Sequence, residues 1–189
     1  MDIFKTASVE EGLTPEEIKA ALLESLEGRT VKHALILPPD FTRFHSNAGY
    51  ITNVYYHALT ERGATVDILP ALGTHVPVTP EQSAAMYGDV PYERLIPHNW
   101  RTDVVRLGEV PAEFLEEVTD GIWHDPVSVE VNRLIMDEKY DLIISPGQVV
   151  PHEVIGMANH AKNIFVGVGG SERSNMDRFD LRFNLRSIL

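Results

Sequence analysis

Polar side chains with acid–base or anion-binding chemistry follow three apolar stretches of this sequence. Asp40 and Arg43 come after HALILP, His75 comes after VDILPAL, and His152 comes after DLIISPG, with Lys162 further along. Because ligands of an open parallel sheet bind beyond the carboxyl ends of its strands, we expect these residues to meet at one sheet edge. Two histidines on opposite sides of one centre suit a reaction that removes and returns protons on either face. The guanidinium fork of Arg43 suits a carboxylate, because it binds two oxygens at once.

Each of these residues also has a simpler explanation when it is taken alone. The carboxylate of Asp40 could cap the helix that follows it, as Asp commonly does. Arg43 and Lys162 are of types that usually face solvent or make surface ion pairs. His75 and His152 could be ordinary loop residues. The functional interpretation therefore depends on the joint pattern.

The remaining candidate groups give less specific signals. The run GVGG contains Gly167, Gly169 and Gly170 and could cradle a phosphate, but it has neither Walker spacing nor a GxGxxG fingerprint before a clear helix. Packing or surface roles are expected for the histidines that open strands, lie in or near helices, or stand beside tryptophans: His33, His45, His57, His98 and His124.

Apolar stretches alternate with helix signals along most of the chain. TPEEIKAALLESLEG has an N-cap threonine, a first-turn proline and a capping-box glutamate, and Gly28 ends it. SNAGYITNVYYHALTERG and TPEQSAAMYG also read as helices. HALILPPD, ATVDILPALGTH and YDLIISPG read as strands, VVRLGEVP is strand-like, VEVNRLIMDEKY reads as a strand running into a helix, and NIFVGVGG is a candidate fourth strand.

This alternation predicts an α/β fold with an open, mostly parallel, Rossmann-like sheet and helices on both faces. We expect residues 1–189 to form one such domain, since this length can bury a sizeable core. The stretch after GVGG mixes charged and apolar residues without a clean period and fits the pattern poorly.

Composition excludes several classes of protein. The formal net charge of −12 argues against nucleic-acid binding, which needs a basic face. The chain has no cysteine, so disulfides, thiolate metal sites and thiol nucleophiles are excluded. We find no signal-peptide core and no run of membrane-spanning length, and we therefore expect a cytoplasmic protein without a membrane partner.

Four stretches in this order resemble the N-terminal domain of the nickel-pincer lactate racemase family: PDFTR, LGTHVPVTPEQ, VNRLIMDEKYDLIISPGQVVPH and AKNIFVGVGG. The resemblance covers most of the chain from about residue 35 to residue 170. Each stretch is weakly specific by itself, whereas the ordered set is strongly so. The resemblance implies a further C-terminal domain that closes over the site, and we expect that these 189 residues do not include it.

The resemblance implies a nickel pincer nucleotide (pyridinium-3-thioamide-5-thiocarboxylic acid mononucleotide nickel) attached covalently to Lys162. It implies that His75 and His152 alternate as general base on the hydroxyl of a small 2-hydroxy acid while hydride moves to and from the cofactor. Asp40 would orient His75, and Arg43 would hold the substrate carboxylate. Backbone near Gly167, Gly169 and Gly170 is expected to contact the cofactor phosphate.

Two departures from the family pattern concern the cofactor. Many members read Ser-Gly-Gly-x-Lys around the lysine, where this chain reads ANHAK at 158–162. The family's nickel-binding histidine falls near Arg178, and arginine has no lone pair to offer a metal. His160 is a conceivable replacement, but the metal ligand stays unknown.

We therefore expect a 2-hydroxyacid racemase or epimerase of the isomerase class that is incomplete without a C-terminal domain or a homo-oligomeric partner. One alternative is a cofactor-free binding or partner domain derived from this family. A third and weaker interpretation is a metal hydrolase built from His75, His152 and Asp40, although no HExxH-type spacing supports it.

Overall fold

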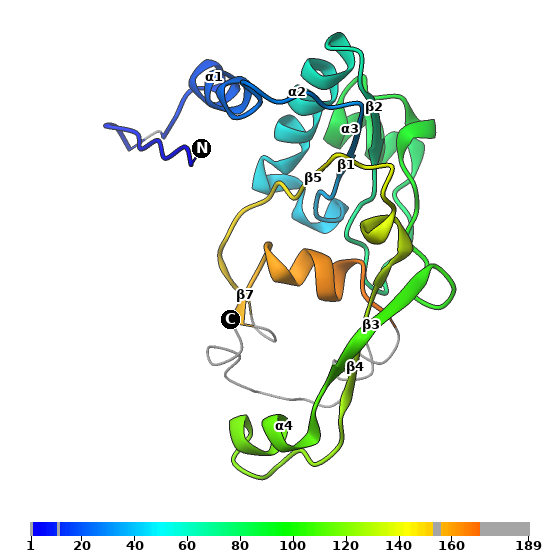
Figure 1. The fold of residues 1–189 in the computed structure, drawn as a ribbon. Helices are drawn as coiled ribbons and strands as arrows, with labels where there is room; N and C mark the ends of the chain where they lie inside the picture. The colour runs from blue at the N-terminus through cyan, green and yellow to red at the C-terminus, as the bar shows by residue number, and fades with distance from the viewer. Residues whose placement is uncertain (1, 11, 153–155, 171–189) are drawn as a thin grey trace.

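The computed structural model describes residues 2–10, 12–152 and 156–170 (Figure 1). The α-helices are α1 (Pro15–Ser25), α2 (Ala48–Glu61), α3 (Pro80–Tyr87) and α4 (Ala112–Val118). The strands are β1 (His33–Ile36), β2 (Thr65–Ile68), β3 (Val104–Val110), β4 (Val127–Asn132), β5 (Leu142–Ile144), β6 (Pro151–His152) and β7 (Gly156–Met157). Three 3-10 helices, η1 (Phe41–Ser46), η2 (Tyr92–Arg94) and η3 (Arg133–Met136), and a π-helix, η4 (Asn163–Gly167), complete the order.

Three parallel strands form the central sheet in the order β2–β1–β5. The middle strand β1 is buried on both faces, since Ala34, Leu35 and Ile36 are all fully inaccessible to solvent. Burial on both faces explains why this strand is an unbroken apolar run instead of an alternating one. The predicted parallel α/β sheet is confirmed.

Helices cover both faces of this sheet, as predicted. On one face, Ile36, Val66 and Ile68 pack with side chains of α1, α2 and α3. On the other face, Leu35 packs with Val168 and with side chains of η3 and η4. The first face therefore carries ordinary α-helices, and the second carries one turn of 3-10 helix and a π-helix.

The prediction of a strand in NIFVGVGG is wrong, because its first five residues, Asn163–Gly167, form η4. Ile164 and Val168, four residues apart, both pack into the second-face cluster, which is helical spacing. The backbone N–H of Val168 donates to the carbonyl of Asn163 at 3.0 Å. A short apolar run does not separate strand from helix by its pattern alone, and here the packing of these side chains decides.

A hairpin of β3 and β4, with α4 between them, extends away from the sheet (Figure 1). Both predicted strands exist, but they pair antiparallel with each other and do not join the parallel sheet. The predicted helix after β4 is the single 3-10 helix η3. Among the described helices, none combines the length and the apolar character needed to cross a membrane.

Candidate functional site

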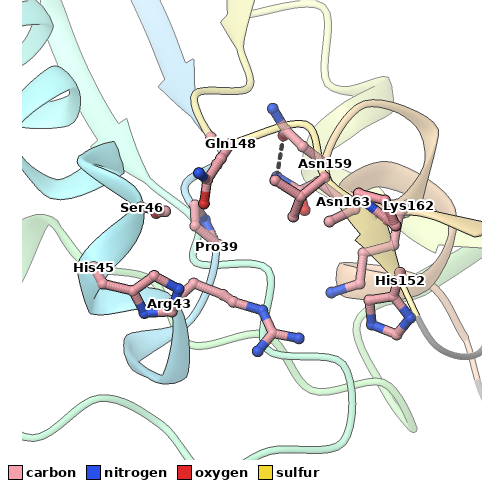
Figure 2. A pocket seen from close by; sticks show the side chains of 13 residues that line it. Pro39, Arg43, His45, Ser46, Gln148, His152, Asn159, Lys162 and Asn163 are labelled. Atoms are coloured by element: carbon pink, nitrogen blue, oxygen red, sulfur yellow. Dashed lines mark hydrogen bonds between the residues drawn. The ribbon is translucent and has the colours of Figure 1, made fainter. Parts of the chain in front are cut away.

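A cleft of about 190 Å³ lies where the chain leaves the carboxyl ends of β1 and β5. Figure 2 shows Arg43, His152 and Lys162 around it, from three separate segments. The structure thus brings together three of the residues that the sequence singled out. Of the described residues that line the cleft, none is an Asp or a Glu. In a chain of net charge −12, this is a local cationic site suited to an anion.

His75 and Asp40 form a pair near this cleft, although neither is among its lining residues. Asp40 is 6% exposed, and its Oδ2 lies 2.6 Å from Nδ1 of His75. Because a carboxylate only accepts hydrogen bonds, Nδ1 of His75 carries a proton, and in the neutral ring the lone pair lies on Nε2. The His75 side chain is 57% exposed, so Nε2 can act as a base toward an incoming ligand.

The same carboxylate also caps η1, as the simpler interpretation proposed. Oδ1 of Asp40 accepts from the Thr42 backbone N–H at 2.8 Å and from the Thr42 hydroxyl. Within η1 the backbone of Arg43 departs from helical geometry (φ −102°, ψ 28°). Asp40 therefore serves both roles, with one oxygen fixing the turn that carries Arg43 and the other holding His75.

The turn that carries His75 is held against η4. The N–H of Gly73 donates to the carbonyl of Gly167 at 2.7 Å, and the N–H of His75 donates to Leu72 at 2.9 Å. A Cβ on Gly167 would lie 2.5 Å from Cβ of Ala71, which real side chains do not tolerate. Glycine at 167 thus lets the Lys162 segment approach the end of β2 closely.

Gly169 and Gly170 also have packing reasons to be glycine. A Cβ on Gly169 would lie 2.1 Å from the carbonyl oxygen of Phe165, and one on Gly170 would lie 1.8 Å from Oε2 of Glu130. Neither these glycines nor Gly167 line the cleft. Their predicted contact with a cofactor phosphate stays a prediction.

A buried amide network fixes the turn that precedes Lys162. Nδ2 of Asn163 donates to Oδ1 of Asn159 at 2.7 Å and to Oγ of Ser145 at 3.2 Å. Asn159 (φ 62°) and His160 (φ 48°) are both left-handed, a conformation that Asn tolerates better than most residues. The network ties this strained turn to the end of β5. Sequence reasoning missed it, although two asparagines four residues apart beside the lysine were visible.

The cleft also includes residues that the sequence did not favour. His45, Ser46 and Gln148 line it, although a surface or packing role was expected for His45 (Figure 2). His45 directly follows the segment that supplies Asp40 and Arg43, and that proximity was the available signal. His160 does not line the cleft.

The family model described as lactate racemase N-terminal domain matches residues 4–178. The chain belongs to this family. Among solved structures, a Thermotoga maritima protein matches with a TM-score of 0.78 and 28% identity over 89% of this chain and 41% of that one. The lactate racemase apoprotein from Thermoanaerobacterium thermosaccharolyticum matches with a TM-score of 0.60 and 22% identity over 83% of this chain and 37% of that one. No curated protein matches.

This lactate racemase-family chain thus spans less than half the length of both solved structures. Its fold is the one shared with the racemase apoprotein. Arg178, near which the family's nickel-binding histidine was expected, lies outside the described residues. Within the described ranges, no group of three His, Cys, Asp or Glu side chains could hold a metal. His75, His152 and Asp40 therefore do not form the three-ligand site that a metal hydrolase would need.

Proposed function

We propose that this chain is the cofactor-anchoring and acid–base part of a 2-hydroxyacid racemase or epimerase. The main support for the proposal is that one cleft is lined by Arg43, His152 and Lys162 and, among the described residues, by no carboxylate. Membership of the lactate racemase family supplies the reaction class. Arg43 and Lys162 give this part of an acidic chain two cations beside an imidazole, which suits an anionic ligand.

Each side chain has a role that its chemistry supports. The Arg43 guanidinium binds the substrate carboxylate through two parallel hydrogen bonds. Nε2 of His75 takes the hydroxyl proton on one face, and the Asp40 carboxylate stabilises the imidazolium that results. His152, on the small β6–β7 ribbon, performs the same transfer on the other face. Alternation of the two bases permits inversion of the stereocentre.

The described residues fit an anionic mononucleotide held by Lys162. Lys162 contributes an amine for covalent attachment, and Arg43 is the lining cation that remains for an anionic group once that amine is acylated. When bound, the nickel pincer nucleotide supplies the acceptor and donor of the substrate hydride. The nickel ligands are left unassigned, because the described side chains offer no preformed metal cluster.

The cleft is open on this chain, and hydride chemistry requires exclusion of water. Since the chain spans 41% and 37% of the two solved structures, we propose that a further domain or a second copy closes the site in the working enzyme. The chain alone then anchors the cofactor with little or no racemase activity. The substrate is a small 2-hydroxy acid such as lactate.

Intact mass and nickel content test the proposal on protein produced together with a pincer-biosynthesis pathway. Lys162→Ala is the diagnostic variant, and Lys19→Ala, on the exposed side of α1, is the matched control. We expect an adduct in the wild type and in Lys19→Ala but none in Lys162→Ala. An adduct without nickel supports anchoring and places the metal ligand outside this chain. An unmodified wild type overturns the proposal and favours a cofactor-free partner domain.

A further inference from the structure

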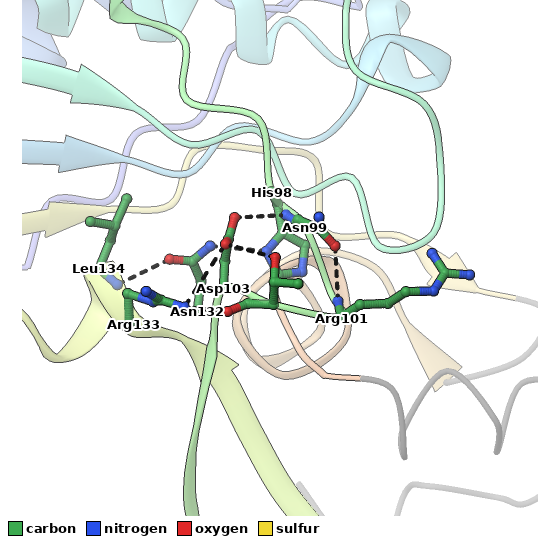
Figure 3. Close-up of polar contacts among 8 residues, drawn as sticks. His98, Asn99, Arg101, Asp103, Asn132, Arg133 and Leu134 are labelled. Carbon is green, nitrogen blue, oxygen red and sulfur yellow. Dashed lines mark hydrogen bonds and ion pairs between the residues drawn. The ribbon is translucent and has the colours of Figure 1, made fainter.

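His98 is a buried histidine that the proposed reaction does not use. It is 5% exposed and lies in the loop between η2 and β3, where sequence reasoning expected a packing or surface role. Its Nε2 lies 3.0 Å from the carbonyl oxygen of Gly169, and its Nδ1 lies 3.0 Å from Nδ2 of Asn132. Figure 3 shows His98 and Asn132 of this network, with Asp103 and Leu134 beside them.

The partners of His98 fix its tautomer. The Gly169 carbonyl only accepts, so Nε2 of His98 carries the proton and donates. Oδ1 of Asn132 accepts from the Leu134 N–H at 3.0 Å, so the amide nitrogen of Asn132 faces His98 and donates to Nδ1. Both ring nitrogens are satisfied only when the imidazole is neutral.

The network reaches the active-site turn through backbone hydrogen bonds. The N–H of Asn132 donates to the carbonyl of Val168 at 2.7 Å. Asn132 and His98 therefore each hydrogen-bond to one of two consecutive residues after η4, Val168 and Gly169. The preceding residue, Gly167, accepts the N–H of Gly73, two residues before His75. One chain of contacts thus runs from His98 to the His75 turn.

We propose that His98, held neutral by Asn132 and Gly169, is a positioning residue that locks the segment after η4 and through it the turn that carries His75. The inference rests on the proposed function only for what His75 does. The chain of contacts from His98 to the His75 turn, called the lock below, is a property of this chain. His98 touches no substrate, and its effect passes through Gly167 and Gly73.

The surroundings of His98 support a neutral ring. Burial lowers its pKa, and this effect is opposed by the hydrogen bond to Gly169 and by the charge of Asp103. Glu130 of β4 packs against the same segment at Gly170. Protonation would place an N–H on Nδ1 against the amide donors of Asn132 and break that contact.

Amide hydrogen exchange and imidazole ¹⁵N signals test the lock on the cofactor-free chain. His98→Leu removes both ring contacts. We expect the protection of the Gly73 amide to fall about tenfold, as for the loss of one buried hydrogen bond, with altered His75 ring signals. The Leu69 amide, which donates to Ile36 at 2.8 Å in the sheet, keeps its protection and is the internal control. His98→Gln, which retains a donor for Gly169, restores part of the Gly73 protection.

Two results would overturn the lock. One is an unchanged Gly73 amide with unchanged His75 signals, and the other is equal loss at Gly73 and Leu69, which means a purely global role. If His98→Leu does not fold, Asn132→Asp decides, because an Asp facing Nδ1 either draws a second proton onto His98 or donates its own proton to Nδ1, and both change the Nδ1 signal. An unchanged Nδ1 signal in Asn132→Asp contradicts the Asn132 contact. Because no cofactor is involved, a failed adduct experiment leaves this test intact.

Discussion

The carboxyl edge of the parallel sheet and strand β3 of the hairpin are built in opposite ways. At the sheet edge, Ala34, Leu35 and Ile36 of β1 are solvent-inaccessible, and Asp40, Asn163 and Gly167 are each hydrogen-bonded to a segment distant in sequence. In the hairpin, most of β3 is exposed, including the apolar side chains of Val105 and Leu107. The candidate site thus sits where neighbouring segments fix the backbone. Strand β3 carries little of that constraint, whereas β4 ends at the buried Asn132, which is bonded to the segment after η4.

This difference shows what positions chemistry in the fold. A base such as His75 must be held close to its productive geometry, which requires locked supports behind it. The sheet edge supplies them through Asp40 and through Gly73 bonded to Gly167. Strand β3 has an exposed ion pair in place of such supports, and the support that the hairpin does supply comes from Asn132 of β4. Matched substitutions in the two regions test the comparison.

Truncating one leucine in each region should give the largest difference in the free energy of unfolding. Leu35 is 0% exposed in β1, and Leu35→Ala should lower the free energy of unfolding by about 2–5 kcal/mol through lost burial and a cavity. Leu107→Ala in the hairpin, at 46% exposure, should change it by about 0.5 kcal/mol or less. Urea unfolding measures both. Similar losses in the two variants would contradict the contrast between the regions.

Two tyrosines that pack around the parallel sheet differ in whether their hydroxyl has a hydrogen-bond partner. The Tyr140 hydroxyl donates to Oδ2 of Asp67 at 2.8 Å, so Tyr140→Phe should cost about 1.5–3 kcal/mol, as for a hydrogen bond to a charged group. The Tyr87 hydroxyl is buried and has no hydrogen-bond partner among the described residues. Tyr87→Phe should therefore be neutral or stabilising. A clear loss for Tyr87→Phe in thermal unfolding would show that the hydroxyl has a partner.

The sequence predicted the sheet domain better than the site, for physical reasons. Local signals were sufficient for α1 and α3, where cap threonines and first-turn prolines fix the helix starts. The same holds for strands such as β1, buried on both faces. The strand prediction for Asn163–Gly167 was wrong, because only tertiary packing separates a short apolar helix from a strand.

For the site, residues after strand ends were predictable because strand polarity places them at one edge, and Arg43, His152 and Lys162 do meet there. The Asp40–His75 contact also follows from that rule together with the family resemblance. The supports were not predictable. The contacts of Asn163 with Ser145 and of His98 with Gly169 join distant segments, and no local pattern specifies such pairings.

Lowering the pH should reduce the free energy of unfolding of the chain, because His98 must become protonated when the chain unfolds. Because the folded state lowers the His98 pKa, the unfolded chain binds more protons as pH falls below about 6.5, and stability is lost until pH passes the folded pKa. The carboxylate of Asp141, whose pKa is lowered by backbone hydrogen bonds from His33 and Lys32, contributes its loss only below about pH 4. Urea unfolding between pH 7.5 and 5 should show that the free energy of unfolding decreases as the pH falls. The decrease should be smaller in His98→Gln than in the wild type. Equal slopes in the two proteins would exclude His98 as the source.

The smallest effect is expected for an ion pair on the hairpin. Arg106 contacts Glu109 within β3, and their side chains are 57% and 52% exposed. An exposed pair gains little Coulomb energy in water and loses side-chain entropy, so Arg106→Ala should change the free energy of unfolding by less than about 0.5 kcal/mol. Raising the salt concentration should leave the difference between the variant and the wild type near zero. A loss above about 1 kcal/mol in urea unfolding exceeds what an exposed pair supplies. It would mean that the hairpin is held by contacts as firm as those of the sheet edge, and the comparison between the two regions would fail.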